Sequence, residues 1–323
     1  MRNVVRAVAA LCLLTAAGEA RAFVRETTTP GHPNTGVCLW WRSRQITYRV
    51  NATSADPRPC GDAAAAEAIA EVGMAAWSTA TRAGEASACT DFRFVKGAPT
   101  TSTALGNDGV NLVVFRSARC NDVIPANDPC VTAGTCATKY NCWEWGAGTI
   151  GLTWTSFDPK TGELRDADME LNGWDGELAA PTGHYFTCAD ATAPRCSSPP
   201  HGQQGCSYVD VGAVVAHEGG HMLGLDHVCS NAFPPPHDAC PAGANVMEPS
   251  VGDVARRVLS PDDVAGVCTI YPKGQGTLTC VNGGKVPEEK DEGGGCASVP
   301  GAELLALLAA VGAMGTLRRA RRG

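Results

Sequence analysis

Three histidines and one glutamate have the types and spacing of a metal-dependent hydrolytic site. The sequence HEGGHMLGLDH begins at His217, so that Glu218 follows the first histidine and His221 lies four residues after it. On an α-helix, side chains four residues apart lie one above the other, and two imidazoles on one face can bind one metal ion. Gly224 can end the helix in a left-handed conformation and bring His227 to the same point as a third ligand.

Three neutral imidazoles with one position left for water are typical of catalytic zinc, because structural zinc is usually closed by four protein ligands. Zinc lowers the pKa of such a water to about 7 and polarises a substrate carbonyl group. Glu218 lies about 100° around the helix from the preceding histidine, and we interpret it as the general base rather than as a ligand. The pattern predicts hydrolysis of a peptide bond by a zinc-activated water, with one zinc ion bound by His217, His221 and His227.

The pattern HExxHxxGxxH is the signature of the metzincin clan, and the residues around it resemble those of matrixin-like zinc metallopeptidases. The sequence NVMEP at 245–249 is similar to the Met-turn, which in that family lies beneath the zinc histidines. The sequence LSPDDV at 259–264, continued through Tyr271-Pro272, resembles the C-terminal helix of the family. The resemblance covers most of residues 37–272 and is strongest after Asp210.

This resemblance implies an α+β fold of the metzincin type: a twisted, mixed five-stranded sheet with a long helix, an active-site helix and disulfide-rich loop insertions. It also implies a shallow cleft, open at both ends, in which the strand at 149–154 binds an extended polypeptide substrate by β-augmentation. An endopeptidase is therefore expected rather than an exopeptidase. The loop at 247–249 would form one wall of the specificity pocket.

Several residues depart from the family pattern. Glu248 stands where a tyrosine is common, so the tyrosine-linked mechanism of astacin-like relatives is not expected. In addition, Val228 stands where many members have serine. Glu170 occupies the position that we align with a structural-zinc histidine of animal matrixins, so a second zinc is not expected either. His184 and His201 lie in an inserted loop, where lone histidines are usually solvated.

Calcium is common in the family, and four aspartates could supply the oxygen ligands that calcium prefers. Their spacing does not match an EF-hand, and they are also typical of turn-forming, solvated residues. Both interpretations stay open for Asp158, Asp166, Asp168 and Asp175.

The elements that must position the site can be located from sequence periodicity. Alternating or β-rich segments predict short strands at 45–50, 91–95, 111–115, 149–154 and 168–171. An alanine-rich segment predicts a long helix at 63–82 with Asp62 as its N-cap. Its expected buried face consists of Ile69, Val72, Ala76 and Trp77.

Segments 117–145 and 173–207 are rich in Cys, Pro, Asn and Gly and are predicted to be disulfide-stapled surface loops. The chain has 16 cysteines. Cys12 and Cys296 lie in two terminal segments that we expect to be cleaved off, as described below, and an even number remains without them. In an exported protein such a count indicates disulfide bonds.

The first 22 residues have the pattern of a secretory signal peptide. Arg2 and Arg6 precede an apolar run at 7–17, which is shorter than the ~20 residues needed to span a bilayer. Ala20-Arg21-Ala22 then offers small residues before a cleavage site at Phe23. We therefore expect export, with an extracellular or outer-surface location.

The other end of the chain has the pattern of a sorting tail. Residues 296–323 begin with Cys296 after three glycines, continue with an apolar stretch at 304–317 and finish with an arginine cluster. This order resembles C-terminal tails of the MYXO-CTERM type, which implies transient membrane anchoring, and a plain C-terminal anchor helix is the alternative. Residues 273–295 are predicted to be a flexible stalk after a catalytic domain at 23–272.

Composition limits the classes of partner. The chain has 323 residues, 44% of them hydrophobic and 18% charged, which excludes a disordered chain. Its formal net charge of −7 argues against nucleic-acid binding, and a monomer that acts on polypeptides is expected.

Two other functions stay in view. One is a non-catalytic, zinc-stabilised surface binding protein (adhesin), and the other is a zinc amidase acting on cell-wall peptides. Glu218 argues against the first, because a zinc site without catalysis needs no base. The NVMEP segment argues against the second.

Overall fold

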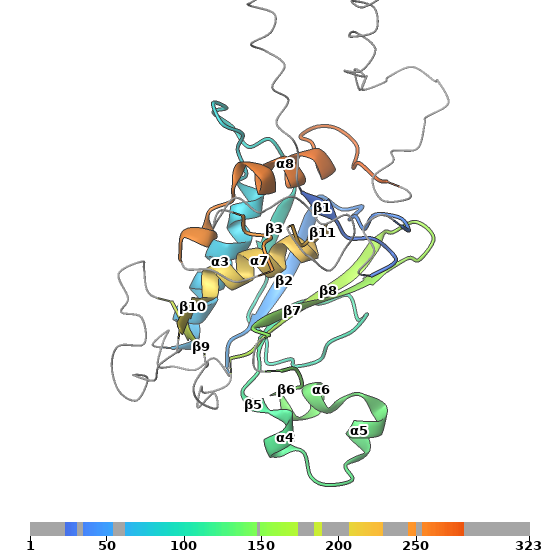
Figure 1. The fold of residues 1–323 in the computed structure, drawn as a ribbon, viewed down its shortest axis with the longest axis vertical. Helices are drawn as coiled ribbons and strands as arrows, with labels where there is room; N and C mark the ends of the chain where they lie inside the picture. The colour runs from blue at the N-terminus through green and yellow to red at the C-terminus, as the bar shows by residue number, and fades with distance from the viewer. Residues whose placement is uncertain are drawn as a thin grey trace, which may run out of the picture. The chain divides into compact units, whose positions relative to one another are not determined.

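A mixed five-stranded sheet and two long helices form the centre of the protein (Figure 1). The computed structural model describes residues 23–30, 35–53, 62–146, 149–173, 184–188, 207–228, 245–249 and 254–280. The strand order in the sheet is β3-β2-β4-β8-β7. The strands are β2 (Gln45–Asn51), β3 (Arg93–Lys96), β4 (Asn111–Phe115), β7 (Gly151–Phe157) and β8 (Leu164–Leu171).

Four strands of the sheet are parallel, and β7 at one edge is antiparallel to its neighbour β8. The predicted α+β class with a mixed five-stranded sheet is thereby confirmed. Strand β2 could be predicted from its alternating pattern, because Ile46, Tyr48 and Val50 are buried while the residues between them are exposed. The strand predicted at 168–171 is β8, which begins earlier, at Leu164. The prediction missed its first residues because buried acidic residues interrupt the apolar pattern of the strand.

The long helix α3 (Ala63–Ser78) begins as predicted, with the Asp62 carboxylate accepting a hydrogen bond from the Ala65 N–H at 2.8 Å. It ends four residues before the predicted end, because Ser78 is tied to β3: its carbonyl accepts from the Arg93 guanidinium at 2.6 Å. The predicted buried face was wrong at Val72, which is 45% exposed. The residues that are buried are mostly small: Ala66, Ala70, Gly73, Met74, Trp77 and Ser78.

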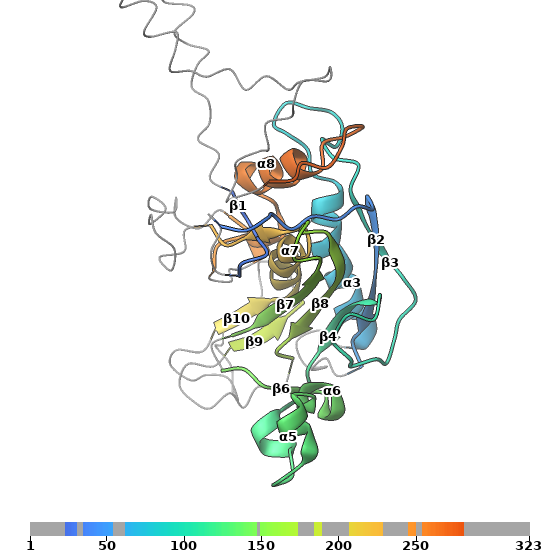
Figure 2. The ribbon, with the colours of Figure 1, turned by 90° about the vertical axis from the view of Figure 1, so that its right-hand side faces the viewer.

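Those small residues let α3 approach a second helix, α7 (Val211–Met222), and both helices cover the same face of the sheet (Figure 2). The Trp77 indole lies at their contact and donates a hydrogen bond to the Ala216 carbonyl at 2.7 Å. Every residue of α7 is buried. The apolar core of the domain therefore lies between this helix pair and the sheet.

The N-terminal segment packs beside the end of α7. Strand β1 (Val24–Arg25) pairs antiparallel with β11 (Leu225–Asp226). The Phe23 N–H donates to Asp262 at 3.0 Å, and Asp262 lies in helix α8 (Pro261–Ile270). A capping box between Ser260 and Asp263 begins this helix. A 3₁₀ helix, η1 (Val254–Arg257), precedes it.

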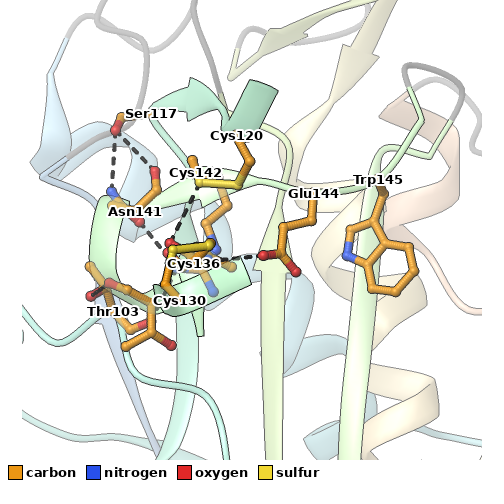
Figure 3. The surroundings of a disulfide bond; sticks show 12 residues. Thr103, Ser117, Cys120, Cys130, Cys136, Asn141, Cys142, Glu144 and Trp145 are labelled. Atoms are coloured by element: carbon orange, nitrogen blue, oxygen red, sulfur yellow. Dashed lines mark hydrogen bonds between the residues drawn. A yellow bond between two sulfur atoms is a disulfide. The ribbon is translucent and has the colours of Figure 1, made fainter. Parts of the chain in front are cut away.

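The segment predicted to be a stapled loop at 117–145 projects from one end of the sheet and contains short elements (Figure 1). They are β5 (Ala118–Arg119), α4 (Cys120–Val123), α5 (Pro129–Ala133), α6 (Cys136–Tyr140) and β6 (Cys142–Trp143). Disulfides join Cys120 to Cys142 and Cys130 to Cys136, and Figure 3 shows the two bonds close together. The prediction of disulfide stapling is confirmed here.

Within the second predicted loop, 173–207, the structure describes only a part. That part includes β9 (His184–Thr187), which pairs in parallel with β10 (Ser207–Asp210). His184 thus lies in a strand, whereas His201 lies outside the described residues.

Two further disulfides link distant parts of the chain, Cys38 to Cys280 and Cys89 to Cys268. Cys280 of the first bond lies in the segment that was predicted to be a flexible stalk. In the same segment, the Leu278 N–H donates to the Ile270 carbonyl at 2.8 Å. Residues 273–280 are therefore attached to the domain. All of the described residues belong to one compact unit, Met1–Val286.

The predicted signal peptide and the predicted sorting tail lie outside the described residues. Among the helices that the structure describes, none is long and apolar enough to cross a membrane.

Candidate metal centre

Helix α7 presents two of the predicted ligands and ends immediately after them. The Asp210 carboxylate caps its beginning by accepting from the Ala213 N–H at 2.8 Å, and the Arg257 guanidinium holds that carboxylate at 2.7 Å. After the last turn of the helix, Gly224 adopts a φ of 91°. Its backbone also lies so close to Leu39 that a Cβ atom on residue 224 would be 2.5 Å from the Leu39 carbonyl oxygen. Only glycine fits this turn, which sends the chain back toward His227.

The structure brings the three predicted histidines together at one point. The Nε2 atoms of His217 and His227 are 3.0 Å apart, those of His221 and His227 are 3.2 Å apart, and those of His217 and His221 are 3.3 Å apart. Within the described part of the chain, these residues are the only group of three or more potential ligands that could hold a metal ion.

The opposite ring nitrogens of two of these histidines are held by oxygen acceptors. His217 Nδ1 lies 2.6 Å from the Val246 carbonyl, and His221 Nδ1 lies 2.8 Å from the Leu225 carbonyl. A carbonyl can only accept, so these contacts assign the proton to Nδ1 and leave the Nε2 lone pair facing the common point. Three imidazole nitrogens arranged in this way fit a divalent transition metal ion.

The charge around the histidines also favours a cation. Burial lowers the pKa of His217 well below its usual value, and burial followed by the nearby His221 lowers the pKa of His227 to about 3. For His221, burial acts to lower the pKa, but the hydrogen bond and attraction from Glu26, with two further carboxylates, raise it to about 9. The carboxylates around His221 therefore favour positive charge at this point.

Glu218 lies beside the histidines and is held against the edge strand. The residue is 4% exposed, and its Oε2 accepts a hydrogen bond from the Thr153 hydroxyl at 2.8 Å. A Cβ at Gly151 would lie 2.7 Å from Glu218 Oε1, so the strand can approach the carboxylate only with glycine there. Burial raises the pKa of Glu218, while the attraction of His221 and the Thr153 hydrogen bond act against that rise.

All four predicted site residues line one cleft of about 680 Å³. Edge strand β7 forms part of its wall, and Pro249 from the predicted Met-turn contributes another part. The lining residues are Glu26, Thr149, Ile150, Gly151, Leu152, Thr153, His217, Glu218, His221, Asp226, His227 and Pro249.

The 245–249 segment is anchored next to α7 by backbone hydrogen bonds. The Asp263 carboxylate accepts from the Val246 N–H at 2.9 Å, and the Met247 carbonyl accepts from the Val228 N–H at 2.9 Å. Met247 is buried. Glu248 is also buried and forms an ion pair with Arg256 at 2.6 Å, so it is an anchor of this segment and not a residue of the cleft wall.

The acidic residues considered for calcium have other partners. Asp158 accepts from the Lys160 N–H at 2.9 Å, Asp166 from the Gly109 N–H at 2.6 Å, and Asp168 from the Gly106 N–H at 2.7 Å. Asp175 lies outside the described residues.

Glu170, considered for a second zinc, forms a buried ion pair with Arg116 at 2.8 Å. It also accepts hydrogen bonds from the Trp145 and Trp154 indoles. Its carboxylate is therefore already bound by N–H donors of the protein.

Sequence reasoning missed two acidic residues of the cleft, Glu26 and Asp226. Asp226 could have been suspected, because it precedes His227 directly. No local signal marks Glu26, because the pairing of β1 with β11 brings it to the site from the other end of the domain.

A scan against protein-family models and a search of curated protein sequences found no match to this chain.

Proposed function

We propose that this protein is an exported zinc metalloendopeptidase of the matrixin-like type, with His217, His221 and His227 as zinc ligands and Glu218 as general base. The observation that carries this proposal is the convergence of three imidazole Nε2 atoms, no more than 3.3 Å apart, next to a buried glutamate in an open cleft.

The donor set supports zinc in particular. Three neutral imidazoles without a fourth protein ligand are typical of catalytic zinc sites, whereas calcium and magnesium prefer oxygen ligands. A zinc ion held by these residues would supply Lewis acidity, which would lower the pKa of a water and polarise a peptide carbonyl. The carboxylates that surround the histidines add to the attraction for a divalent cation.

Glu218 is placed to move the proton in this reaction. Thr153 holds one carboxylate oxygen, which leaves the other free to accept a proton from the attacking water and later to donate it to the leaving amine. Burial raises the pKa of Glu218, which makes its carboxylate a stronger proton acceptor. No covalent intermediate is needed.

Strand β7 supports a polypeptide as the substrate. It is the last strand of the sheet on the side of the cleft, so the backbone groups on its outer edge are available to an added strand. An extended peptide that pairs there would lie across the histidines, in the manner of β-augmentation. The 245–249 segment, packed next to α7 as a Met-turn would be, supports the matrixin-like assignment.

The cross-links support export to an oxidising compartment, because disulfide bonds persist there and are rare in the cytosol. The contact between the Phe23 N–H and Asp262 supports cleavage of the signal peptide before Phe23. Cleavage there would place a new ammonium group beside that carboxylate. We propose an extracellular or outer-surface location, a monomer, and transient membrane anchoring by residues 296–323.

The test is hydrolysis of an unbiased peptide library by the oxidised, secreted full-length protein, beside the Glu218→Ala variant and a chelated sample. We expect internal cleavage by the wild type, and a loss of about 10²–10⁴-fold in the variant, because the proton relay is removed. The variant should retain one zinc ion per chain. Glu163→Ala, at a residue that does not line the cleft and pairs with Arg42, is the matched control and should leave the cleavage rate unchanged.

Two results would contradict the proposal. A wild-type protein that binds one zinc ion but cleaves no peptide would favour the zinc-stabilised binding protein. Cleavage of cell-wall muropeptides but not of polypeptides, in a parallel assay, would favour the amidase.

A further inference from the structure

Glu26 contacts a proposed metal ligand from the N-terminal segment of the domain. Its Oε1 lies 2.9 Å from Nδ1 of His221, the same nitrogen that lies 2.8 Å from the Leu225 carbonyl. His221 Nδ1–H is thus shared between a carbonyl and a carboxylate. The corresponding nitrogen of His217 faces the Val246 carbonyl.

The backbone on both sides of Glu26 is held in place. Its N–H donates to the Gly224 carbonyl at 2.9 Å, and its own carbonyl accepts from the Leu39 N–H at 2.9 Å. Immediately before it, Arg25 pairs with Leu225 in the β1–β11 ladder. The side chain of Glu26 is 22% exposed and lines the cleft. Its carboxylate therefore reaches His221 from a fixed backbone position and not from a mobile surface loop.

We propose that Glu26 is a positioning residue of the metal centre, which orients the His221 ring and strengthens its Nε2 as a metal ligand. A carboxylate that accepts from the distal N–H of a ligating histidine fixes the ring and raises its basicity. The inference rests on the proposed function, because it takes His221 to be a metal ligand.

This role makes the N-terminal strand a part of the metal centre. Helix α7 and the turn after it supply all three ligands, but neither contributes a carboxylate to a ligand Nδ1 in the described contacts. Glu26 also places a carboxylate close to the three imidazole ligands, where it can balance part of the charge of a divalent ion. Glu218 is not needed for that balance and remains available as the base.

The experiment measures zinc affinity and not activity. The full-length, oxidised protein and its Glu26→Gln and Glu26→Ala variants compete for zinc with a chromophoric chelator at a single pH. We expect the Glu26→Ala variant to bind zinc about 10–100-fold more weakly than the wild type. Glu26→Gln keeps an oxygen acceptor but loses the charge, so its affinity should lie between the two.

Glu163→Gln is the matched control, because it removes the same charge from a surface residue that pairs with Arg42. Its zinc affinity should equal that of the wild type. Substitution of cobalt(II) for zinc gives a second readout, since its visible absorption reports the ligand geometry. We expect this spectrum to change in Glu26→Ala and not in Glu163→Gln.

The outcomes separate the inference from the proposed function. Equal zinc affinity and equal cobalt spectra for the wild type and Glu26→Gln would overturn the role of Glu26 and leave the zinc site intact. A wild type that binds no zinc would overturn both. If Glu26→Ala fails to fold, the nearly isosteric Glu26→Gln variant decides, with thermal unfolding of the metal-free proteins to show that its fold is unchanged.

Discussion

The two faces of strand β8 are both buried, but by different chemistry. On the inner face, Ala167, Met169 and Leu171 belong to the apolar core, and helix α7 packs against this strand. On the outer face, the alternate residues are all acidic and nearly inaccessible: Asp166, Asp168 and Glu170. One strand thus separates the apolar support of the metal centre from a layer of buried carboxylates.

The difference follows from what covers each face. Helices satisfy their own backbone groups, so they can pack on apolar side chains without leaving an unpaired N–H. The outer face is covered by an irregular loop around 104–110 and by the disulfide-stapled insertion, whose backbone groups need acceptors. Asp166 and Asp168 accept N–H groups of that loop, and Glu170 binds Arg116 at the base of the insertion.

The four described disulfides are divided between the insertion and the rest of the domain. None of the residues 117–145 belongs to the apolar core, and two disulfides hold this insertion. No disulfide among the described residues involves α7, which is held by packing and hydrogen bonds alone. The comparison teaches that packing and hydrogen bonds position α7 and its histidines, whereas the insertion depends on cross-links and the outer face of β8 on buried acceptors.

The largest loss of stability is expected in the helix pair α3 and α7, which covers the inner face of the sheet. Trp77→Ala should lower the free energy of unfolding by about 3–5 kcal/mol, because a cavity would form between α3 and α7 and the hydrogen bond to Ala216 would be lost. Urea denaturation measures this loss. Val72→Ala, on the exposed side of the same helix, is the control and should change stability little. Equal losses in the two variants would contradict the packing of α3 on α7.

A smaller and more local effect is expected in the insertion. Replacing Cys120 and Cys142 by serine releases a loop that spans 22 residues and should weaken the insertion by about 3 kcal/mol. Limited proteolysis with mass spectrometry should find the first cuts within 117–146, while zinc affinity stays that of the wild type. Removal of the Cys130–Cys136 bond, which closes a shorter loop, should have less effect. Loss of zinc before cleavage of the insertion would show that the two regions are not independent.

The smallest effect concerns the outer carboxylates and pH. Burial raises the pKa of Asp168 from 3.8 to about 7, so the folded protein binds a proton that the unfolded chain releases. Its contribution to stability is therefore complete below about pH 4 and is lost as the pH rises through about 7. Asp168→Asn should cost about 1 kcal/mol, because the amide can accept only one of the two N–H groups.

Thermal unfolding between pH 4 and pH 8 checks this prediction. The wild type should lose stability over that range, and the Asp168→Asn variant should lose less. A variant with the same pH dependence as the wild type would show that Asp168 is ionised throughout and that other groups cause the change.

Much of the fold could be predicted because its elements carry local signals. β2 alternates, α3 has an N-cap, and the β4 strand is a continuous apolar run, so all three were located at or near their true bounds. β8 was found only in part, because three buried acids resemble a solvated segment until the groups that bind them are known. The short elements of the insertion were missed because each has only a few residues and cross-links hold them.

The sequence by itself determined the core of the candidate metal centre. The spacing of His217 and His221 on a helix, with a glycine turn before His227, brings three imidazoles together through the geometry of about ten consecutive residues. Only the tertiary structure decided which other groups meet them. Glu26 reaches His221 and Thr153 reaches Glu218 by pairing and packing of segments far apart in the chain, and no local periodicity encodes the partner of such a contact.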